Sequence, residues 1–224
     1  MLPFVEIRRH SAEKPWTYEL LDTYQRSLAD ALVASSLDGG TPGRILISEL
    51  APVITLGRRE CSQDLILPEN ELVSRGISIF QTDRGGRATY HGPGQWVLFV
   101  VDRLDRMTGD RRGVRRAVEG LLETGRAVGE RFLVSQVHLK DGAATGIWTA
   151  QGKLASVGVH IHHGVLLHGM ALNGYRTPQS FLGLRPCGLD AQVDFLFSRP
   201  DEDQFMSVPE LLVAELRRHF WNQG

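Results

Sequence analysis

A glycine-rich stretch from 83 to 95 holds the densest group of residues able to do chemistry. It reads Asp-Arg-Gly-Gly-Arg-Ala-Thr-Tyr-His-Gly-Pro-Gly-Gln. The glycines and the proline let the backbone turn sharply and approach a ligand closely, and Arg84, Thr89, Tyr90 and His91 supply hydrogen-bond donors of different reach. The stretch is neither a P-loop nor a dinucleotide fingerprint, because neither glycine pattern is present. It predicts a ligand-binding loop, and a purely structural loop is the alternative.

Cys187 is the first candidate nucleophile. It stands between Pro186 and Gly188, on irregular backbone and outside any amphipathic stripe. A thiolate at this position would attack an electrophile if a nearby cation or hydrogen-bond donors favoured its formation. The alternative is a small buried hydrophobe, which is what most free cysteines are. Cys61, the only other cysteine, has no comparable neighbours.

Lys153 is the second candidate. Of the 25 basic residues only Lys14, Lys140 and Lys153 are lysines. Arginine stays protonated in proteins, whereas a desolvated lysine can donate or accept a proton. Judged on its own, Lys153 is better interpreted as an exposed residue at a hairpin tip, because Gln151-Gly152 is a typical turn.

The histidines at 160, 162, 163 and 168 suggest a metal site. His160 and His162 would share one face of a strand. Two ligands are too few for zinc, however, and no second cluster of Cys, Asp or Glu has matching spacing. We therefore expect no metal and interpret these histidines as the polar face of a half-buried strand.

Hydrophobic spacing predicts the elements that must position these residues. A closing helix is expected from Ser207, with Glu210 at capping-box spacing and Pro209 in the first turn. The intermixed elements predict an α/β (α+β mixed) fold with a mixed β-sheet flanked by helices. The other elements expected are helices over 16–37 and 112–132, two strands within 44–56 broken at 51–52, strands at 77–82 and 96–101, and strands with tight turns over 145–150 and 153–173.

Length and composition limit the class of protein. The chain has 224 residues, 42% of them hydrophobic and 23% charged, which suits a single catalytic domain over 1–224 and excludes a disordered chain. A formal net charge of −1 argues against nucleic-acid or membrane-surface binding. No apolar run approaches the ~18–20 residues of a membrane span, and the first ten residues lack a signal-peptide core. Two cysteines make no disulfide framework. We expect a cytoplasmic monomer.

Taken together, these motifs resemble the lipoyl(octanoyl) transferase family. The similarity runs from about residue 48 to 190, and its segments follow one another in the family's order and approximate spacing. These segments are Arg84–Gln95, Gly146–Trp148, Lys153–Gly158, His168–Asn173 and Pro186–Gly188. The string Tyr-His-Gly-Pro-Gly-Gln with the downstream lysine and Pro-Cys-Gly is specific to this family.

The resemblance implies the fold of the catalytic domains of biotin and lipoate protein ligases, and an acyl transfer without ATP, metal or other cofactor. Octanoyl-acyl carrier protein is the implied donor, Cys187 carries the thioester intermediate, and Lys153 lies beside the thiol and manages protons. The implied acceptors are lysines on lipoyl domains of 2-oxoacid dehydrogenases and on the glycine cleavage H protein. The implied substrate-binding residues are Arg84, Gly85, Gly86, Arg87, Ala88, Thr89, Tyr90, His91, Ser156, Val157, Gly158, Gly169, Met170 and Ala171.

The residues themselves agree with this chemistry. A thiolate is a good nucleophile and a good leaving group, and small residues such as Gly158, Gly169 and Ala171 would leave an apolar channel open for the octanoyl tail. The chain departs from the family at Arg87-Ala88, where Gln-Val is usual, and in the segments after Asn173 and Cys187. Three alternatives stay open: an ATP-dependent lipoate or biotin protein ligase, a non-catalytic acyl-binding or carrier-binding protein, and a cysteine hydrolase with His168 or His91 as its base.

Overall fold

A mixed β-sheet forms the middle layer of the molecule. The structure is a computed structural model that describes residues 1–35, 40–59, 62–133, 136–185 and 192–221. Within these residues seven strands follow the order β1-β2-β6-β10-β9-β8-β7, with β1 parallel to β2 and the other neighbours antiparallel. The predicted mixed sheet is confirmed. The strands are β1 (Phe4–Arg8), β2 (Arg44–Ser48), β6 (Gln95–Arg103), β7 (His138–Lys140), β8 (Gly146–Trp148), β9 (Lys153–His162) and β10 (Val165–Asn173).

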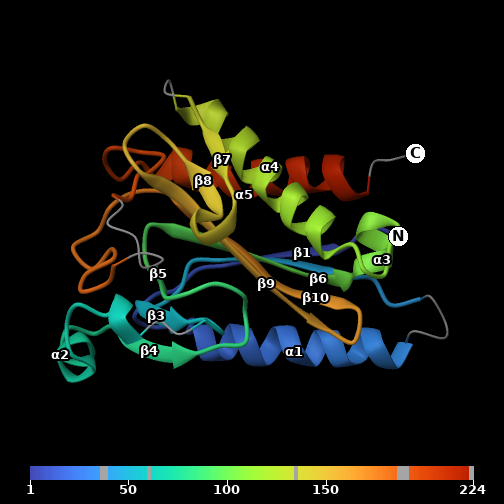
Figure 1. Ribbon diagram of the computed structural model, residues 1–224, viewed down its shortest axis with the longest axis horizontal. Coiled ribbons are helices and arrows are strands. Elements are labelled where there is room, and N and C mark those ends of the chain that lie inside the picture. The colour runs from blue at the N-terminus through green and yellow to red at the C-terminus, as the bar shows by residue number, and fades with distance from the viewer. Residues whose placement is uncertain (36–39, 60–61, 134–135, 186–191, 222–224) are drawn as a thin grey trace.

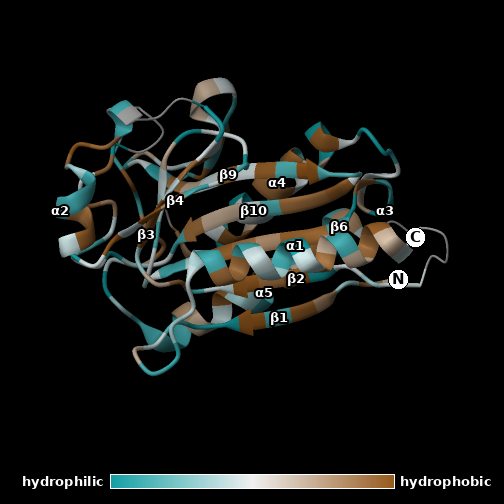
Figure 2. Ribbon diagram, turned by 90° about the horizontal axis from the view of Figure 1, so that it is seen from below, coloured by the Kyte–Doolittle hydropathy of each residue, from teal (hydrophilic) through white to brown (hydrophobic). Residues whose placement is uncertain are grey.

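Helices cover both faces of this sheet (Figure 1). Helix α1 (Tyr18–Ala34) lies along one face, and α4 (Val114–Phe132) and α5 (Glu202–Phe220) lie along the other, with the short α3 (Leu104–Thr108) at the end of β6. β6 and β10 are buried on both faces, which is why they are nearly continuous runs of apolar residues. The apolar strands β6 and β10 and the two-faced α1 are visible in Figure 2. No helix in the described residues is long and apolar enough to span a bilayer.

A smaller sheet lies at one end of the large one and corrects the expected loop. Its order is β4-β3-β5, formed by β3 (Val53–Leu56), β4 (Ser78–Gln81) and β5 (Thr89–His91), and α2 (Glu69–Ser74) and the single turns η2 (Ser62–Asp64) and η3 (Gly142–Ala144) complete the elements. The stretch 83–95 was predicted to be loop throughout. β5 shows instead that its middle pairs antiparallel with β3, so the irregular parts are 83–88 and 92–94. Thr89 and Tyr90 have the residue types that favour strands.

The expected start of the last helix is wrong. α5 begins at Glu202, with Asp201 as its N-cap accepting from the Gln204 N–H at 3.0 Å, so Pro209 lies inside the helix. Proline has no N–H to give to the carbonyl four residues earlier, which belongs to Phe205. The indole N–H of Trp96 on β6 donates to that carbonyl at 2.9 Å. A tertiary contact therefore replaces the helix bond that Pro209 lacks.

This replacement predicts a coupling between Trp96 and Pro209. Trp96→Phe keeps an aromatic ring against Phe205 but leaves the buried Phe205 carbonyl without a donor, so we expect a loss of about 1–3 kcal/mol in the free energy of unfolding. In a Pro209→Ala background the new backbone N–H satisfies the carbonyl, and Trp96→Phe should be clearly less damaging. A double-mutant cycle by urea denaturation measures this coupling. Equal losses in both backgrounds would show that the indole bond does not compensate for the proline.

Candidate active site

A cavity of about 290 Å³ lies between the loop 84–88, the start of α4 and strands β6, β9 and β10. Every described residue that the sequence marked as a site residue lines it except Tyr90, whose buried ring packs on Phe181 with centroids 5.4 Å apart. The expected residues in the lining are Arg84, Gly85, Gly86, Arg87, Ala88, Thr89, His91, Lys153, Ser156, Val157, Gly158, Gly169, Met170 and Ala171. Motifs far apart in the chain thus enclose one space.

The loop 84–88 forms one wall of the cavity because it lies directly on β9. The Gly85 N–H donates to the Val159 carbonyl at 2.9 Å, and a Cβ added at Gly158 would lie 2.7 Å from the Gly85 carbonyl oxygen. A Cβ at Gly169 would lie 2.3 Å from the Leu98 carbonyl oxygen on β6. We expected Gly158 and Gly169 to be glycine in order to leave a channel open, and this explanation is wrong. Both glycines line the cavity, but they are needed because backbone segments approach each other there.

Arg84 fixes the beginning of this wall. Its side chain is buried, at 7% exposure, and its guanidinium donates to the Thr55 carbonyl at 2.7 Å and to the Thr55 hydroxyl at 2.8 Å. The Thr55 hydroxyl lies 3.2 Å from His91 Nε2, and His91 Nδ1 donates to Gln95 Oε1 at 2.8 Å. Because the Thr55 oxygen accepts from Arg84, its own proton goes to His91, which must then be the neutral Nδ1–H tautomer.

This hydrogen-bond chain continues to Lys153. Gln95 Nε2 donates to Asn173 Oδ1 at 2.9 Å, and Asn173 Nδ2 donates to the Lys153 carbonyl at 3.2 Å and to the Asp194 carbonyl at 3.0 Å. All of these side chains are buried. The chain ties the small sheet, the middle of the large sheet and the segment after 191 into one polar network, which rigidifies the walls of the cavity.

Lys153 is the buried lysine of the site. It is only 3% exposed, so the interpretation as an exposed hairpin residue is wrong. Its Nζ donates to the Thr145 carbonyl at 3.0 Å and lies 5.5 Å from the centre of the Trp148 ring. Gly146 makes this position possible, because a Cβ there would lie 2.5 Å from the Lys153 Cε. A carbonyl oxygen and an electron-rich ring face therefore both lie beside the Lys153 nitrogen.

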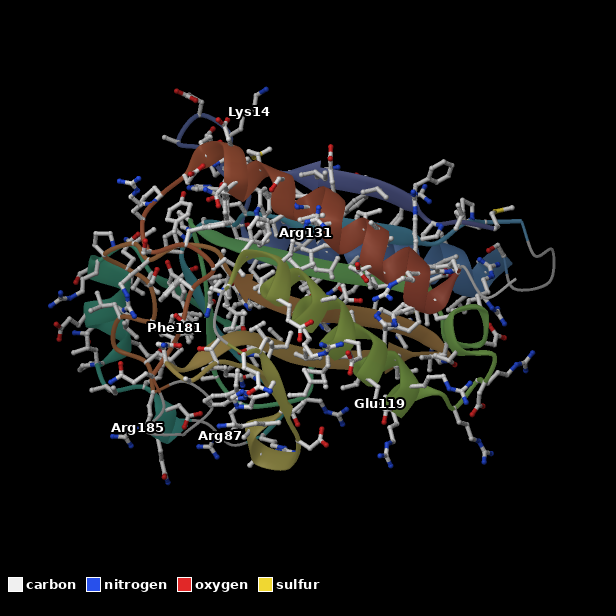
Figure 3. The ribbon with its side chains drawn as sticks, turned by 90° about the horizontal axis from the view of Figure 1, so that it is seen from above. Lys14, Arg87, Glu119, Arg131, Phe181 and Arg185 are labelled. Carbon is white, nitrogen blue, oxygen red and sulfur yellow. The ribbon has the colours of Figure 1, made fainter. Side chains whose placement is uncertain are left out.

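Cys187 lies outside the described residues, as does Cys61. The described residues on either side of the segment 186–191 are held near the cavity. Before it, the Arg185 N–H donates to the Asp64 carbonyl at 2.7 Å, and the Asp64 carboxylate receives both Nε and Nη2 of the cavity residue Arg87. After it, the Lys153 N–H donates to the Gln192 carbonyl at 2.8 Å. Figure 3 shows Arg87 and Arg185 on the same side of the molecule.

The departure at Arg87 also has a structural explanation. Its guanidinium forms a bidentate pair with Asp64 at 2.6 and 3.0 Å, and the Asp64 side chain is buried. A bidentate pair holds both partners in one orientation. Arg87 therefore joins the loop 84–88 to η2, and the Asp64 carboxylate compensates the charge of its guanidinium.

Burial lowers the pKa of His91 to about 3, with the positive charge of Arg84 acting in the same direction. The unfolded chain binds this proton below about pH 6.5 and the folded chain does not, so folding stability falls as the pH falls from 6.5 toward 3. Between pH 7 and pH 5 we expect His91 to account for a loss of about 2 kcal/mol. Urea denaturation of the wild type and of His91→Gln measures this, since the variant should show a shallower dependence on pH. The same slope in both proteins would contradict the assignment.

The other histidines point toward α1 and the wall. His160 Nε2 lies 3.5 Å from Asp83, and His162 Nε2 lies 3.0 Å from Asp30 on α1, so the two histidines share a face as predicted. His168 is fully buried, with its Nε2 3.0 Å from Asp83. No group of three or more possible metal ligands occurs among the residues described.

Several lining residues were not expected from the sequence. Among them are Tyr18 of α1, Phe99 of β6 and Thr145, whose carbonyl receives Lys153. One signal did point to α1: Gln25 interrupts its apolar stripe, and it is buried against His168. Tyr18 and Phe99 carry no comparable signal, because a buried aromatic side chain is typical of any core. Thr145 carries none either, because it contributes a backbone carbonyl, which every residue has.

Comparison with known proteins gives one consistent result. The profile of the family described as the lipoyl protein ligase A/B catalytic domain matches residues 23–198. An octanoyltransferase from Magnetococcus marinus is 38% identical over 151 residues, covering 67% of this chain and 66% of that protein. One from Erwinia tasmaniensis is 31% identical over 220 residues, covering 98% of this chain and 91% of that protein. A lipoate-protein ligase A solved with ATP bound has a TM-score of 0.63 at 15% identity, covering 97% of this chain and 86% of that chain, and shares the fold.

Proposed function

Because the chain belongs to the lipoyl protein ligase A/B catalytic-domain family, we propose that it transfers an octanoyl group from octanoyl-acyl carrier protein to lysines of lipoyl domains. The group travels as a thioester on Cys187. The residues implied to bind substrate are those of the cavity, with Tyr90 outside its lining. The acceptors are the lipoyl domains of 2-oxoacid dehydrogenases and the glycine cleavage H protein. No metal or ATP takes part in the reaction.

The observation that carries this proposal is the buried Lys153 ammonium in the wall of the cavity. A lysine is rarely buried unless its charge is used or compensated. Here its own backbone N–H is bonded to Gln192, the first described residue after the segment that contains Cys187. An ammonium near a thiol stabilises the thiolate by Coulomb attraction. Lys153 is therefore the group that activates Cys187.

The two half-reactions balance with this pair alone. In the first, the Cys187 thiolate attacks the thioester carbonyl, the bond to the carrier's sulfur breaks, and the departing thiolate takes a proton from the Lys153 ammonium. In the second, the acceptor amine attacks the Cys187 thioester, loses a proton to the neutral Lys153 amine, and Cys187 leaves as a thiolate. The original charges are restored, so no external acid or base is consumed.

The lining of the cavity fits an acyl chain. Its deeper wall is apolar, from Val97, Phe99, Met170 and Ala171, while Arg84 and Lys153 bring polar atoms to the same space. A cavity of about 290 Å³ is at the small end of ligand sites, which suits a medium chain. Backbone N–H groups of the glycine-rich wall can stabilise the oxyanion formed at the thioester carbonyl.

Intact-mass spectrometry tests the proposal. The protein is mixed with octanoyl-acyl carrier protein, and we expect a single octanoyl adduct that peptide mapping locates on Cys187. Adding a lipoyl domain without ATP should move the octanoyl group onto that domain. No adduct, with the lipoyl domain modified only when octanoate and ATP are supplied, would identify an ATP-dependent ligase. No modification under either condition would indicate an acyl-binding protein.

A further inference from the structure

His168 has an unusual backbone for a residue in the middle of a strand. Its φ is +62°, in the left-handed region that side chains other than glycine rarely adopt. Along β10, Leu166 and Met170 point toward α4 and α5, and Leu167 and Ala171 point toward α1. Alternation would direct the imidazole of His168 toward α4. The left-handed backbone turns it toward α1 instead, and such strain persists only where surrounding contacts compensate for it.

Those contacts come from α1. The His168 N–H donates to Gln25 Oε1 at 2.9 Å, while Gln25 Nε2 at 3.1 Å and the Tyr18 hydroxyl at 3.2 Å face His168 Nδ1. The imidazole is fully buried. Because two donors face Nδ1, the ring proton is on Nε2, which lies 3.0 Å from Asp83 Oδ1. We call Tyr18, Gln25, His168 and Asp83 the histidine bridge.

The bridge ends at the wall of the cavity. Asp83 is bonded directly to Arg84, the first residue of the loop 84–88 that lines the cavity. It also contacts Arg26 of α1 at 3.0 Å and His160 of β9 at 3.5 Å. Together with His168 of β10, one carboxylate therefore contacts three elements. The hydrogen bond from His168 is the largest cause of the lowered pKa of Asp83, so the carboxylate stays charged at neutral pH.

We propose that His168 is a positioning residue, which holds the loop 84–88 at a fixed distance from β10 and so makes the enzyme discriminate between acyl chains of different length. The inference rests on the proposed function, because it assigns a role in selecting the acyl donor. His168 lines the cavity and also contacts the loop through Asp83, which accepts its Nε2 proton. Its Nδ1 lone pair faces the Gln25 and Tyr18 donors, so neither ring nitrogen is available as the base of a hydrolase.

The expected change in acyl-chain preference follows from how many methylenes of the acyl chain contact the loop 84–88. Burying one methylene strengthens binding about fourfold. If a loosened wall admits two more methylenes, the preference for an octanoyl over a dodecanoyl donor should fall about 15-fold.

Two variants separate the effect of the histidine bridge on acyl-chain preference from the effect of the strained backbone at His168. His168→Gly tolerates the left-handed φ and removes the ring, leaving a space that free imidazole fits. Asp83→Ala keeps the ring and removes its contact with the wall. We compare kcat/KM for octanoyl-acyl and dodecanoyl-acyl carrier protein, with and without imidazole. In both variants the preference for the octanoyl donor should fall about 15-fold. Imidazole should restore the preference in His168→Gly but not in Asp83→Ala.

Asp30→Ala is the matched control. It breaks a similar histidine–carboxylate contact, 3.0 Å between His162 of β9 and Asp30 of α1, but Asp30 is exposed and does not line the cavity. Its preference should equal that of the wild type. An unchanged preference in Asp83→Ala, or recovery of Asp83→Ala with imidazole, would overturn the inference.

Hydrogen exchange provides a readout that does not depend on turnover. The Gly85 and Arg58 N–H groups hold the wall through bonds to Val159 and Arg84. Their exchange should be faster in Asp83→Ala and unchanged in Asp30→Ala, and equal protection in all proteins would also refute the bridge. If the wild type transfers no acyl group, the proposed function fails, and this measurement still decides whether His168 positions the wall.

Discussion

Cys187→Ser is expected to lower the rate of octanoyl transfer on the order of 10³-fold or more. The reason is that a serine hydroxyl stays protonated near neutral pH, whereas Cys187 is expected to react as a thiolate. The variant should also give no stable adduct with octanoyl-acyl carrier protein. The substitution changes one atom, so the protein should fold as before. Steady-state transfer to a lipoyl domain measures the loss.

Cys61→Ser is the matched control for this prediction. The chain has two cysteines, and only Cys187 lies in the Pro-Cys-Gly motif. Cys61→Ser should keep the full rate and the adduct. A large loss in Cys61→Ser, or an adduct that persists in Cys187→Ser, would assign the intermediate to another residue.

Lys153→Arg is expected to lower transfer by about 10²–10⁴-fold, the range typical of a general acid or base. Arginine keeps the positive charge but cannot release a proton. The longer, branched guanidinium also has little room, because Lys153 lies against Gly146 and the Thr145 carbonyl. The pH dependence of the Cys187 alkylation rate separates the effect of the Lys153 charge from proton transfer. The midpoint of this dependence should lie below the free-thiol pKa of about 8.5 in the wild type, and at a higher pH in Lys153→Met.

Lys140→Arg is the corresponding control, since the Lys140 ammonium lies 4.0 Å from the centre of the same Trp148 ring but is exposed and absent from the cavity lining. Its transfer rate should match that of the wild type. Equal losses at Lys140 and Lys153 would mean that the ring environment, and not a proton carried by Lys153, determines the rate.

The site could be predicted from the sequence to the extent that its chemistry lies in short motifs. Each motif is a contiguous segment, and each brings residues to one cavity: Arg84–Thr89 from the wall, Lys153 and Ser156–Gly158 from β9, and Gly169–Ala171 from β10. Their types are informative because close backbone approach needs glycine, and because a lysine, unlike an arginine, can exchange a proton. The strands could be predicted for a similar reason, since β6 and β10 are buried on both faces and are nearly continuous apolar runs.

Errors occurred where a distant residue decides the local outcome. Pro209 is a reasonable first-turn residue by local rules, and only the Trp96 indole allows it inside α5. Arg87 stands out as an extra charge until Asp64 is seen to match it. Gln25 breaks the apolar stripe of α1 because its partner is His168, 143 residues further along the chain. None of these partners can be found from periodicity, which reports only on residues within a few turns or strand positions.

The sequence by itself determined the family and the sheet-and-helix composition, because each depends on residue types within short segments. It also led to the prediction, through the family resemblance, that Cys187 and Lys153 form the catalytic pair. The tertiary structure alone decided that Lys153 is buried and that α1 supports the cavity wall through His168. It also decided that a chain of hydrogen bonds links Arg84 to the Lys153 carbonyl, through Thr55, His91, Gln95 and Asn173. The physical reason is that burial and hydrogen-bond partners depend on which segments pack together. Those neighbours are assembled only when the whole chain folds.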